Sequence, residues 1–209
     1  MTSDKAKLYF SPAACSQAVH IALREAGLAP ELAQVDLATH KLADGGDYLA
    51  INPRGYVPLL ELGDGSRHTE VTALLQYVGD LVPESGLMPA VGTAARFEVL
   101  KWLAFVSSEL HKVASPWLWN KETADTTRKA CRDKFTLRVA ELDAILGTRD
   151  WLAGDAFTVA DAYGFNIVSW APILGISLKA YPSVQDWLAR ASQRPAVRAA
   201  LVAEGLLKP

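Results

Sequence analysis

The stretch KLYFSPAACS, residues 7–16, decides the first part of the fold. Its apolar beginning, residues 6–10, predicts a short strand, and residues 16–27 have the apolar spacing of a helix that Gly27 ends. Cys15 is therefore expected at the mouth of a helix, directly after a strand. Unpaired N–H groups at a helix start favour an anion, so a thiol placed there loses its proton more easily and becomes nucleophilic.

The residues that follow predict a small mixed sheet. Two further strands are expected at residues 32–37 and 57–62, and the turn at 63–66 sends the chain back so that residues 67–69 pair with the third strand. Residues 72–81 then have helical spacing. Strand, helix, strand, hairpin and helix together predict an α/β unit with a mixed sheet.

The second half of the chain has only helical periodicity. We expect an α/β domain over residues 1–83, a linker over 84–92 that is rich in proline and glycine, and an all-helical domain over 93–209. One long helix is expected from residue 93 to about 114, another over 126–146, and a buried one over 160–171 behind the capping-box variant Thr158-Val159-Ala160-Asp161. Ser183 is expected to cap the next helix, and the last runs from Pro195 to Gly205.

Composition excludes several classes of function. The 209 residues carry a net charge of -2, which argues against nucleic acid as a partner, and no apolar run approaches the roughly 20 residues that cross a bilayer. The first five residues lack an export signal, so a cytoplasmic location is expected. Cys15 has no second cysteine at Cys-x-x-Cys spacing. Cys131 falls on an apolar helical stripe and is expected in the core. No histidine, cysteine or acidic residues have the spacing of metal ligands.

Two segments of the α/β unit are candidates to meet Cys15. If the bond before Pro58 is cis, the N–H and C=O of Val57 face outward and can pair with a bound peptide like an added strand; an ordinary edge-strand proline is the alternative. Glu70 precedes a helix, where a carboxylate can hold a ligand ammonium group, and the alternative is a solvated glutamate at a helix start.

A third candidate lies in the helical half. At helical spacing, Ala104, Ser108, His111 and Ser115 share one small, polar face, although Ser115 precedes Pro116 and the helix can end there. Such a face can line a cleft in which His111 donates to a sulfur or a carboxylate. The alternative is a histidine that is simply exposed or satisfied within the fold.

These residues resemble a bacterial glutathione S-transferase of the beta class. The resemblance covers the chain from about residue 8 to 205. The Val-Pro and Thr-x-x-Asp elements belong to the whole superfamily, whereas the cysteine site and the run Ser107–Lys112 are specific to the class. The segments that carry it are residues 9–16, 20–27, 47–49, 52–58, 107–112 and 158–163.

The resemblance implies a thioredoxin-like N-terminal domain, an all-helical C-terminal domain and a homodimer. Glutathione would be the co-substrate, with no metal: its cysteinyl backbone would pair with Val57 before a cis Pro58, and its γ-glutamyl end would meet Glu70 and the N–H of Val71. Cys15 would touch its sulfur and form a mixed disulfide with it. The other implied site residues are Tyr56, Ser108, Glu109, His111, Trp170 and, as a further wall of the apolar pocket, Trp117.

Three positions depart from the family pattern. Val71 stands where glycine or serine is usual, His40 (followed by Lys41) where a lysine often reaches the glycyl carboxylate, and Ala104 where an asparagine is common. Each lost hydrogen bond to a charged group is expected to cost about 1.5–3 kcal/mol of binding free energy. We therefore expect a modest affinity for glutathione.

The functional prediction is an enzyme of detoxification that conjugates glutathione to a small apolar electrophile, with a thiol–disulfide branch through Cys15. Two other hypotheses stay open. One is a non-catalytic module that uses the same fold for binding or regulation, because fold does not fix function. The other is a glutaredoxin-like reductase, which would reduce mixed disulfides quickly and conjugate little.

Overall fold

A computed structural model describes residues 6–208 and divides into two compact units. Met1–Lys5, where the sequence shows no export signal, lie outside the described residues, as does Pro209. The first unit comprises residues 1–87 and 194–209, and the second comprises residues 88–193. The predicted combination of a mixed-sheet, thioredoxin-like unit with a helical unit is confirmed.

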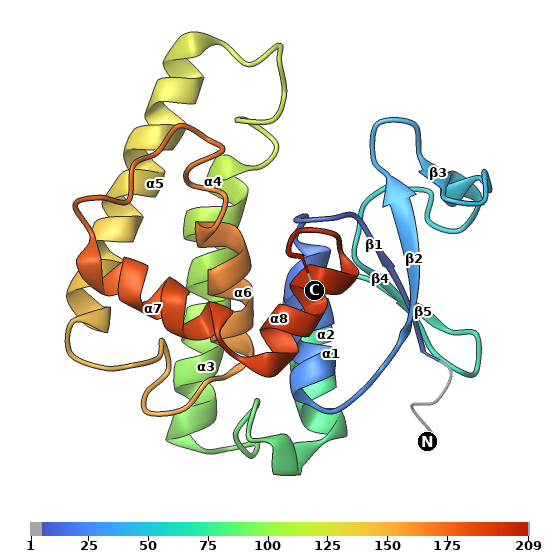
Figure 1. Cartoon of the computed structure of the whole chain (residues 1–209), viewed down its shortest axis with the longest axis horizontal. Helices are drawn as coiled ribbons and strands as arrows, with labels where there is room; N and C mark the ends of the chain where they lie inside the picture. Colours follow the sequence, from blue (N-terminus) through green and yellow to red (C-terminus); the bar gives the residue numbers. More distant parts are fainter. Residues whose placement is uncertain (1–5, 209) are drawn as a thin grey trace. The chain divides into compact units, whose positions relative to one another are not determined.

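The first unit is built on a five-stranded mixed sheet with the order β3-β2-β1-β4-β5 (Figure 1). The central strand β1 runs parallel to β2 and antiparallel to β4, with Leu8 opposite Leu60 and Tyr9 opposite Leu59. The strands are β1 (Lys7–Phe10), β2 (Glu31–Asp36), β3 (Lys41–Leu42), β4 (Leu59–Glu61) and β5 (Arg67–His68).

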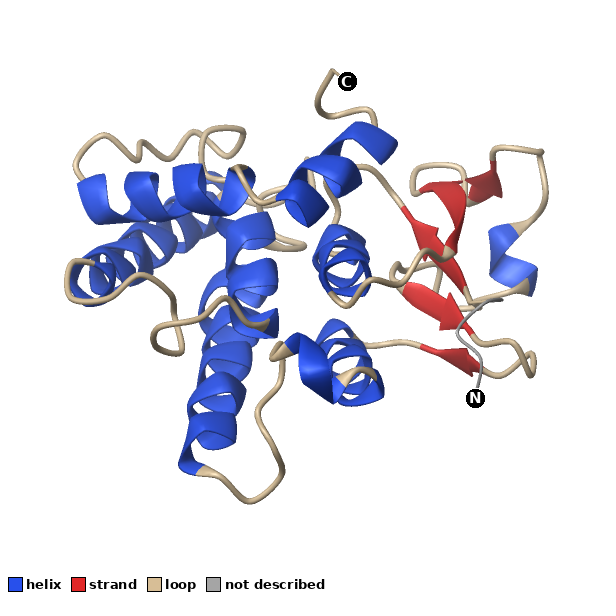
Figure 2. Ribbon diagram, turned by 60° about the horizontal axis from the view of Figure 1, so that its bottom comes forward, coloured by secondary structure: helices blue, strands red, loops and turns tan. Residues whose placement is uncertain are grey.

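Successive side chains of β1 point to opposite faces of the sheet, and both faces are buried. The helices α1 (Ser16–Glu25) and α2 (Val71–Leu81) cover one face, and the Phe10 ring lies 6.3 Å from the His20 ring of α1. The short 3-10 helix η1 (Tyr48–Ala50) covers the other, where Tyr9 and Tyr48 are 5.6 Å apart between ring centres. Figure 2 shows these two layers on opposite sides of the strands.

The last helix belongs to the first unit rather than to the helical one. α8 (Pro195–Ala203) packs against α1, and its buried residues are Val197 and Ala200. The prediction had instead assigned all of residues 93–209 to the helical domain. The sequence pattern finds the amphipathic helix but does not identify the surface that its apolar face covers. Within the predicted linker, η2 (Pro83–Ser85) is followed by the buried Leu87 and Met88.

The second unit is helical among its described residues. Its helices are α3 (Ala94–Phe105), η3 (Val106–His111), α4 (Lys112–Ala114), α5 (Asp125–Leu146), α6 (Val159–Val168) and α7 (Pro182–Ser192). The predicted capping box is present: Thr158 caps the start of α6, and the Asp161 side chain accepts a hydrogen bond from the Thr158 N–H at 3.0 Å. α6 is buried along its whole length, as expected for a helix at the centre of the unit.

The structure differs from the sequence-based prediction in four elements, which are β3, η1, α7 and η3. β3 and η1 were not predicted, because two or three residues are too few to show a periodicity. Ser183 does not cap α7; the helix begins one residue earlier at Pro182, whose fixed φ suits a first helical turn. The long helix after residue 93 ends at Ala114 as predicted, but residues 106–111 form a π-helix within it.

Among the described residues, no helix combines the length and the apolar character needed to span a membrane.

Candidate functional site

The loop between β1 and α1 presents Cys15 immediately before the first residue of the helix. Within the loop, Ala14 N–H donates to the Ser11 carbonyl at 3.0 Å, and the Ser16 hydroxyl lies 3.2 Å from Ser11 N and 3.3 Å from Ser11 O. Cys15 is half-buried, so its sulfur is not sealed in the core. The placement of a thiol at a helix start, expected from the sequence, is confirmed.

The Cys15 sulfur meets the chain segment before Pro58. Its Sγ donates to the Val57 carbonyl at 3.3 Å, and the bond between Val57 and Pro58 is cis. The sequence is compatible with a cis bond and with an ordinary edge-strand proline, and the structure has the cis form. The expectation that the Val57 carbonyl is unpaired is wrong, because the thiol already occupies it.

A network of hydrogen bonds fixes the turn that leads to Val57. The Tyr56 carbonyl accepts from Tyr48 Oη at 2.8 Å and from Asn52 Nδ2 at 2.7 Å, and the Tyr56 side chain is 71% exposed. Gly55 has a φ of +67°, and a Cβ there would lie 2.6 Å from His40 Cε1, so only glycine fits. His40 is thus packed against this turn, and the adjacent Lys41 opens β3 with an exposed side chain.

Glu70 precedes α2 in an uncommon backbone conformation. Its φ is 71°, which is rare for a residue other than glycine and is found preferentially at functional positions. The carboxylate points to solvent, with 69% of the side chain exposed, and pairs with Arg54 at 3.2 Å. Val71, the first residue of α2, is buried. The structure therefore places Glu70 near the turn that carries Val57, since Arg54 belongs to that turn.

His111 lies at the end of the π-helical segment of the second unit and is buried. Its Nδ1 shares a hydrogen bond with Tyr163 Oη at 2.6 Å, and its ring meets Trp170 edge-on at 5.3 Å. Burial lowers the pKa of His111 to about 4, and the neighbouring charge of Lys112 acts in the same direction. The imidazole is therefore neutral near pH 7.

Ser108 and Glu109 do not share a polar face with His111. Ser108 is exposed, and its hydroxyl donates to the Ala104 carbonyl at 3.0 Å. The Glu109 carboxylate accepts from Arg138 at 2.8 Å and pairs with Lys134 at 3.3 Å, and these two hydrogen bonds lower its pKa. The face predicted for Ala104, Ser108, His111 and Ser115 assumed regular α-helical spacing, whereas residues 106–111 form a π-helix whose i→i+5 hydrogen bonds change that spacing.

The two tryptophans expected to wall an apolar pocket have different surroundings. Trp170 is buried between His111 and Trp119, with 5.7 Å between the two tryptophan ring centres. Trp117 is half-exposed and lines an open hollow of about 530 Å³ in the second unit, together with Cys131 and Lys134. Cys131 is only half-buried, so its expected place in the core is wrong. Sequence reasoning missed Trp119, whose contact with Trp170 is formed by tertiary packing.

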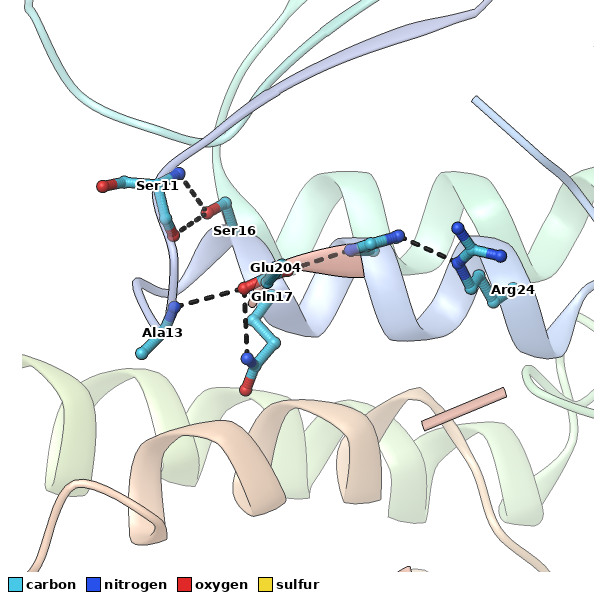
Figure 3. A network of polar contacts seen from close by, with 7 residues as sticks. Ser11, Ala13, Ser16, Gln17, Arg24 and Glu204 are labelled. Atoms are coloured by element: carbon cyan, nitrogen blue, oxygen red, sulfur yellow. Dashed lines mark hydrogen bonds and ion pairs between the residues drawn. The ribbon is translucent and has the colours of Figure 1, made fainter. Parts of the chain in front are cut away.

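A buried carboxylate behind the Cys15 loop was also missed. Glu204, next to the end of α8, accepts hydrogen bonds from Ala13 N–H and from the side chains of Gln17 and His20 (Figure 3). No signal in the sequence pointed to it, because nearly two hundred residues separate Glu204 from Ala13. Among the described residues, no group of three or more histidine, cysteine or acidic side chains is placed to hold a metal ion.

Comparisons with known proteins match both units. Residues 12–81 match the glutathione S-transferase N-terminal domain, and residues 94–195 match the C-terminal domain of the same family. The glutathione S-transferase GstA of Escherichia coli O157:H7 is 38% identical over 200 residues, which cover 96% of this chain and 99% of that relative.

Solved structures agree with these relatives. A sphingomonad glutathione S-transferase complexed with glutathione has 45% identity and a TM-score of 0.91, covering 96% of this chain and 100% of the other. The bacterial beta-class glutathione S-transferase of Sphingomonas chungbukensis has 42% identity, the same TM-score and the same coverage.

Proposed function

Because this chain belongs to the glutathione S-transferase family, we propose that it conjugates glutathione to a small apolar electrophile and that Cys15 adds a thiol–disulfide branch. The observation that carries the proposal is the Cys15 thiol at the start of α1, hydrogen-bonded to the Val57 carbonyl beside the cis Pro58. The proposal includes a homodimer and a cytoplasmic location, which are typical of the family.

In this proposal the first unit holds the tripeptide. A bound cysteinyl backbone pairs with Val57 and displaces the Cys15 thiol from the carbonyl, which brings the ligand sulfur next to Cys15. The exposed Glu70 carboxylate takes the ligand ammonium group, and the N–H groups at the start of α2, beginning with Val71, take its carboxylate. Tyr56, with most of its side chain in solvent, flanks the peptide.

The second unit supplies a neutral histidine and apolar walls. His111 carries no charge at pH 7, so it acts as a hydrogen-bonding group that Tyr163 orients, rather than as an acid. Trp170 and Trp117 are the aromatic walls proposed for the electrophile, with Ser108 as a polar group beside them. Glu109, which is held by Arg138 and Lys134, serves chiefly to fix the segment that carries these residues.

The thiol–disulfide branch needs no further oxidant. The Cys15 thiolate attacks one sulfur of oxidised glutathione, a Cys15–glutathione disulfide forms, and the other glutathione leaves as a thiolate that takes up a proton. With a disulfide between glutathione and a second thiol as the substrate, Cys15 takes the glutathionyl group in the same way and the second thiol leaves as a thiolate; a glutathione thiolate then attacks the Cys15–glutathione disulfide, which regenerates Cys15 and gives oxidised glutathione, so that the substrate disulfide is the oxidant. The positive end of α1 supports the thiolate of Cys15 in the first step.

The test is a mass spectrum of the native protein after incubation with oxidised glutathione. We expect one glutathionyl group per chain, lost in Cys15→Ser and kept in the matched Cys131→Ser variant. Retention on immobilised glutathione and turnover of a chromogenic electrophile test the conjugation branch. Adducts on Cys131 alone would contradict the role of Cys15, and neither retention nor turnover would favour the non-catalytic module.

A further inference from the structure

The helix α8 is attached to α1 at both of its ends. At its beginning, Arg194 forms a bidentate ion pair with Glu25, with N–O distances of 2.6 and 2.8 Å. Just after its end, Glu204 reaches the start of α1 and the loop before it (Figure 3). The two attachments lie on the same pair of packed helices, but only the second one contacts the loop that carries Cys15.

Glu204 is a buried carboxylate with three N–H donors. One oxygen accepts from Ala13 N–H and from Gln17 Nε2, both at 3.1 Å, and the other meets His20 Nδ1 at 2.9 Å. The side chains of Glu204 and His20 have no exposed surface. Since an uncompensated buried charge is very costly, the donors must stay in place for the carboxylate to be tolerated.

His20 connects this carboxylate to a cation. Arg24 Nε donates to His20 Nε2 at 3.0 Å, so that nitrogen is the acceptor and the ring proton belongs on Nδ1, which donates to Glu204. Arg24, His20 and Glu204 thus form a continuous chain of hydrogen bonds along α1. Such chains polarise one another, so each member strengthens the next.

The contact to Ala13 falls at the strained position of the Cys15 loop. Ala13 has a φ of 60°, a left-handed conformation that is costly for alanine, and it lies two residues before Cys15. The Glu204 carboxylate holds the N–H of that residue, and the Ser11–Ser16 hydrogen bonds hold the loop on its other side. Loss of the Glu204 carboxylate removes the hydrogen bond to the Ala13 N–H and with it one constraint on the left-handed conformation that orients the cysteine.

We propose that Glu204 is a positioning residue for Cys15: through Ala13 it fixes the loop so that the thiol faces the Val57 carbonyl and the incoming glutathione sulfur. Gln17, His20 and Arg24 hold Glu204 in place for this task. The inference rests on the function proposed for Cys15, and it adds a residue that is remote in sequence and does not touch the ligand.

Glu204→Gln and Glu25→Gln form a matched pair for the test. Both replacements keep the shape of the side chain and remove one charged contact between α8 and α1, but Glu25 does not contact the loop. In Glu204→Gln, an amide NH2 group takes the place of one carboxylate oxygen. It then faces an N–H donor of Ala13, Gln17 or His20 that has lost its acceptor. Both variants are made in a Cys131→Ser background, so that Cys15 is the only thiol, and both are expected to lower the Tm.

The first readout is the selectivity of Cys15, measured as the ratio of its rate constants with oxidised glutathione and with 2-hydroxyethyl disulfide. We expect Glu204→Gln to lower this ratio by at least about tenfold, as the loss of a charged hydrogen bond allows. Glu25→Gln should leave it within about twofold. The second readout is hydrogen exchange at Ala13, which should speed up by at least about tenfold in Glu204→Gln alone.

Equal changes in the two variants, or none in Glu204→Gln, would overturn the positioning role. If Glu204→Gln does not fold, the same two measurements are made on Glu204→Asp. This variant keeps the negative charge, but its side chain is one methylene group shorter and so moves the carboxylate away from the Ala13 N–H. If the unaltered protein forms no adduct with oxidised glutathione, the function proposed for Cys15 fails. The exchange of Ala13 then still decides whether Glu204 holds the loop.

Discussion

Each unit buries one carboxylate among the described residues, and the two are held in opposite ways. Asp161 in the second unit accepts hydrogen bonds from Thr158 and Leu152, three and nine residues away, and from Trp187. The described partners of the Glu204 carboxylate in the first unit lie 184 or more residues away. A local carboxylate organises one helix start, whereas the remote one joins the two ends of the chain around a proposed reactive loop.

The largest effect is expected from removing the local carboxylate. Asp161→Ala leaves the N–H groups of Leu152 and Thr158 and the Trp187 indole without an acceptor in a site that water does not reach. We expect a loss of about 4 kcal/mol in the free energy of unfolding, measured by urea denaturation. The exposed Asp155 offers the matched control, and Asp155→Ala should change stability by less than about 0.5 kcal/mol. A similar loss of unfolding free energy in Asp161→Ala and Asp155→Ala would contradict the role of Asp161 as a buried acceptor.

The second prediction uses the pH dependence of stability in the helical unit. Burial raises the pKa of Asp161 from 3.8 to about 6, so the folded state binds the extra proton and stability falls as pH rises from about 4 to 6. The pKa of His111 is lowered from 6.5 to about 4, so its contribution rises with pH over the same window. The two contributions oppose each other in the unaltered protein.

Removing either group should reveal the other. Relative to the unaltered protein, His111→Gln should lose about 3 kcal/mol of stability as pH rises from 4 to 6.5, and Asp161→Asn should gain about 3 kcal/mol from 4 to 6. Urea denaturation at a series of pH values measures both differences. Curves that stay parallel to that of the unaltered protein would mean that neither group titrates as its burial implies.

The same contrast explains what could be predicted from the sequence. The Thr158–Asp161 capping box and the strand, loop and helix around Cys15 were found because their determinants lie within a few residues of each other. The π-helical segment that ends at His111 was not found, because a single i→i+5 turn within a longer helix is too short to produce a periodicity of its own in the sequence. Glu204 was missed because tertiary packing alone brings it to Ala13.

For the same reason, the site residues with local determinants were predicted better than those whose contacts depend on tertiary packing. Cys15 lies in a segment with a strong local signal, the sequence leaves the bond before Pro58 open between cis and trans, and the structure joins Cys15 to the cis form through the Val57 carbonyl. Ser108 was placed with His111 by counting along a regular helix, and Glu109 was added by the family resemblance; their actual contacts are Ala104 for Ser108, and Arg138 and Lys134 for Glu109. The ionic partners of Glu109 come from α5, which a pattern within one helix cannot identify.

A third prediction concerns the chemistry of the first unit. Cys15→Ala should lower the rate of thiol–disulfide exchange by at least about a hundredfold and the rate of conjugation by less than about tenfold, because in conjugation the ligand sulfur is the attacking atom. The two rates are measured with a glutathione mixed disulfide and with a chromogenic electrophile. Equal losses would mean that Cys15 takes part in both reactions in the same way.

The smallest effect is expected at Val71, the buried first residue of α2, next to Glu70. Its β-branched side chain crowds the helix start and offers no hydroxyl to a bound carboxylate, in contrast to the serine or glycine that is usual in the family. Val71→Ser should therefore lower the Kd for glutathione about fivefold, which corresponds to about 1 kcal/mol. Isothermal titration calorimetry measures the change.

Val71→Ala separates the two causes, because it removes the β-branch without adding a hydroxyl. If crowding dominates, alanine and serine should improve binding equally; if the hydroxyl dominates, only serine should. An unchanged Kd in both variants would show that neither the β-branch nor the missing hydroxyl at position 71 limits the binding of glutathione, since both variants keep the backbone N–H groups at the start of α2.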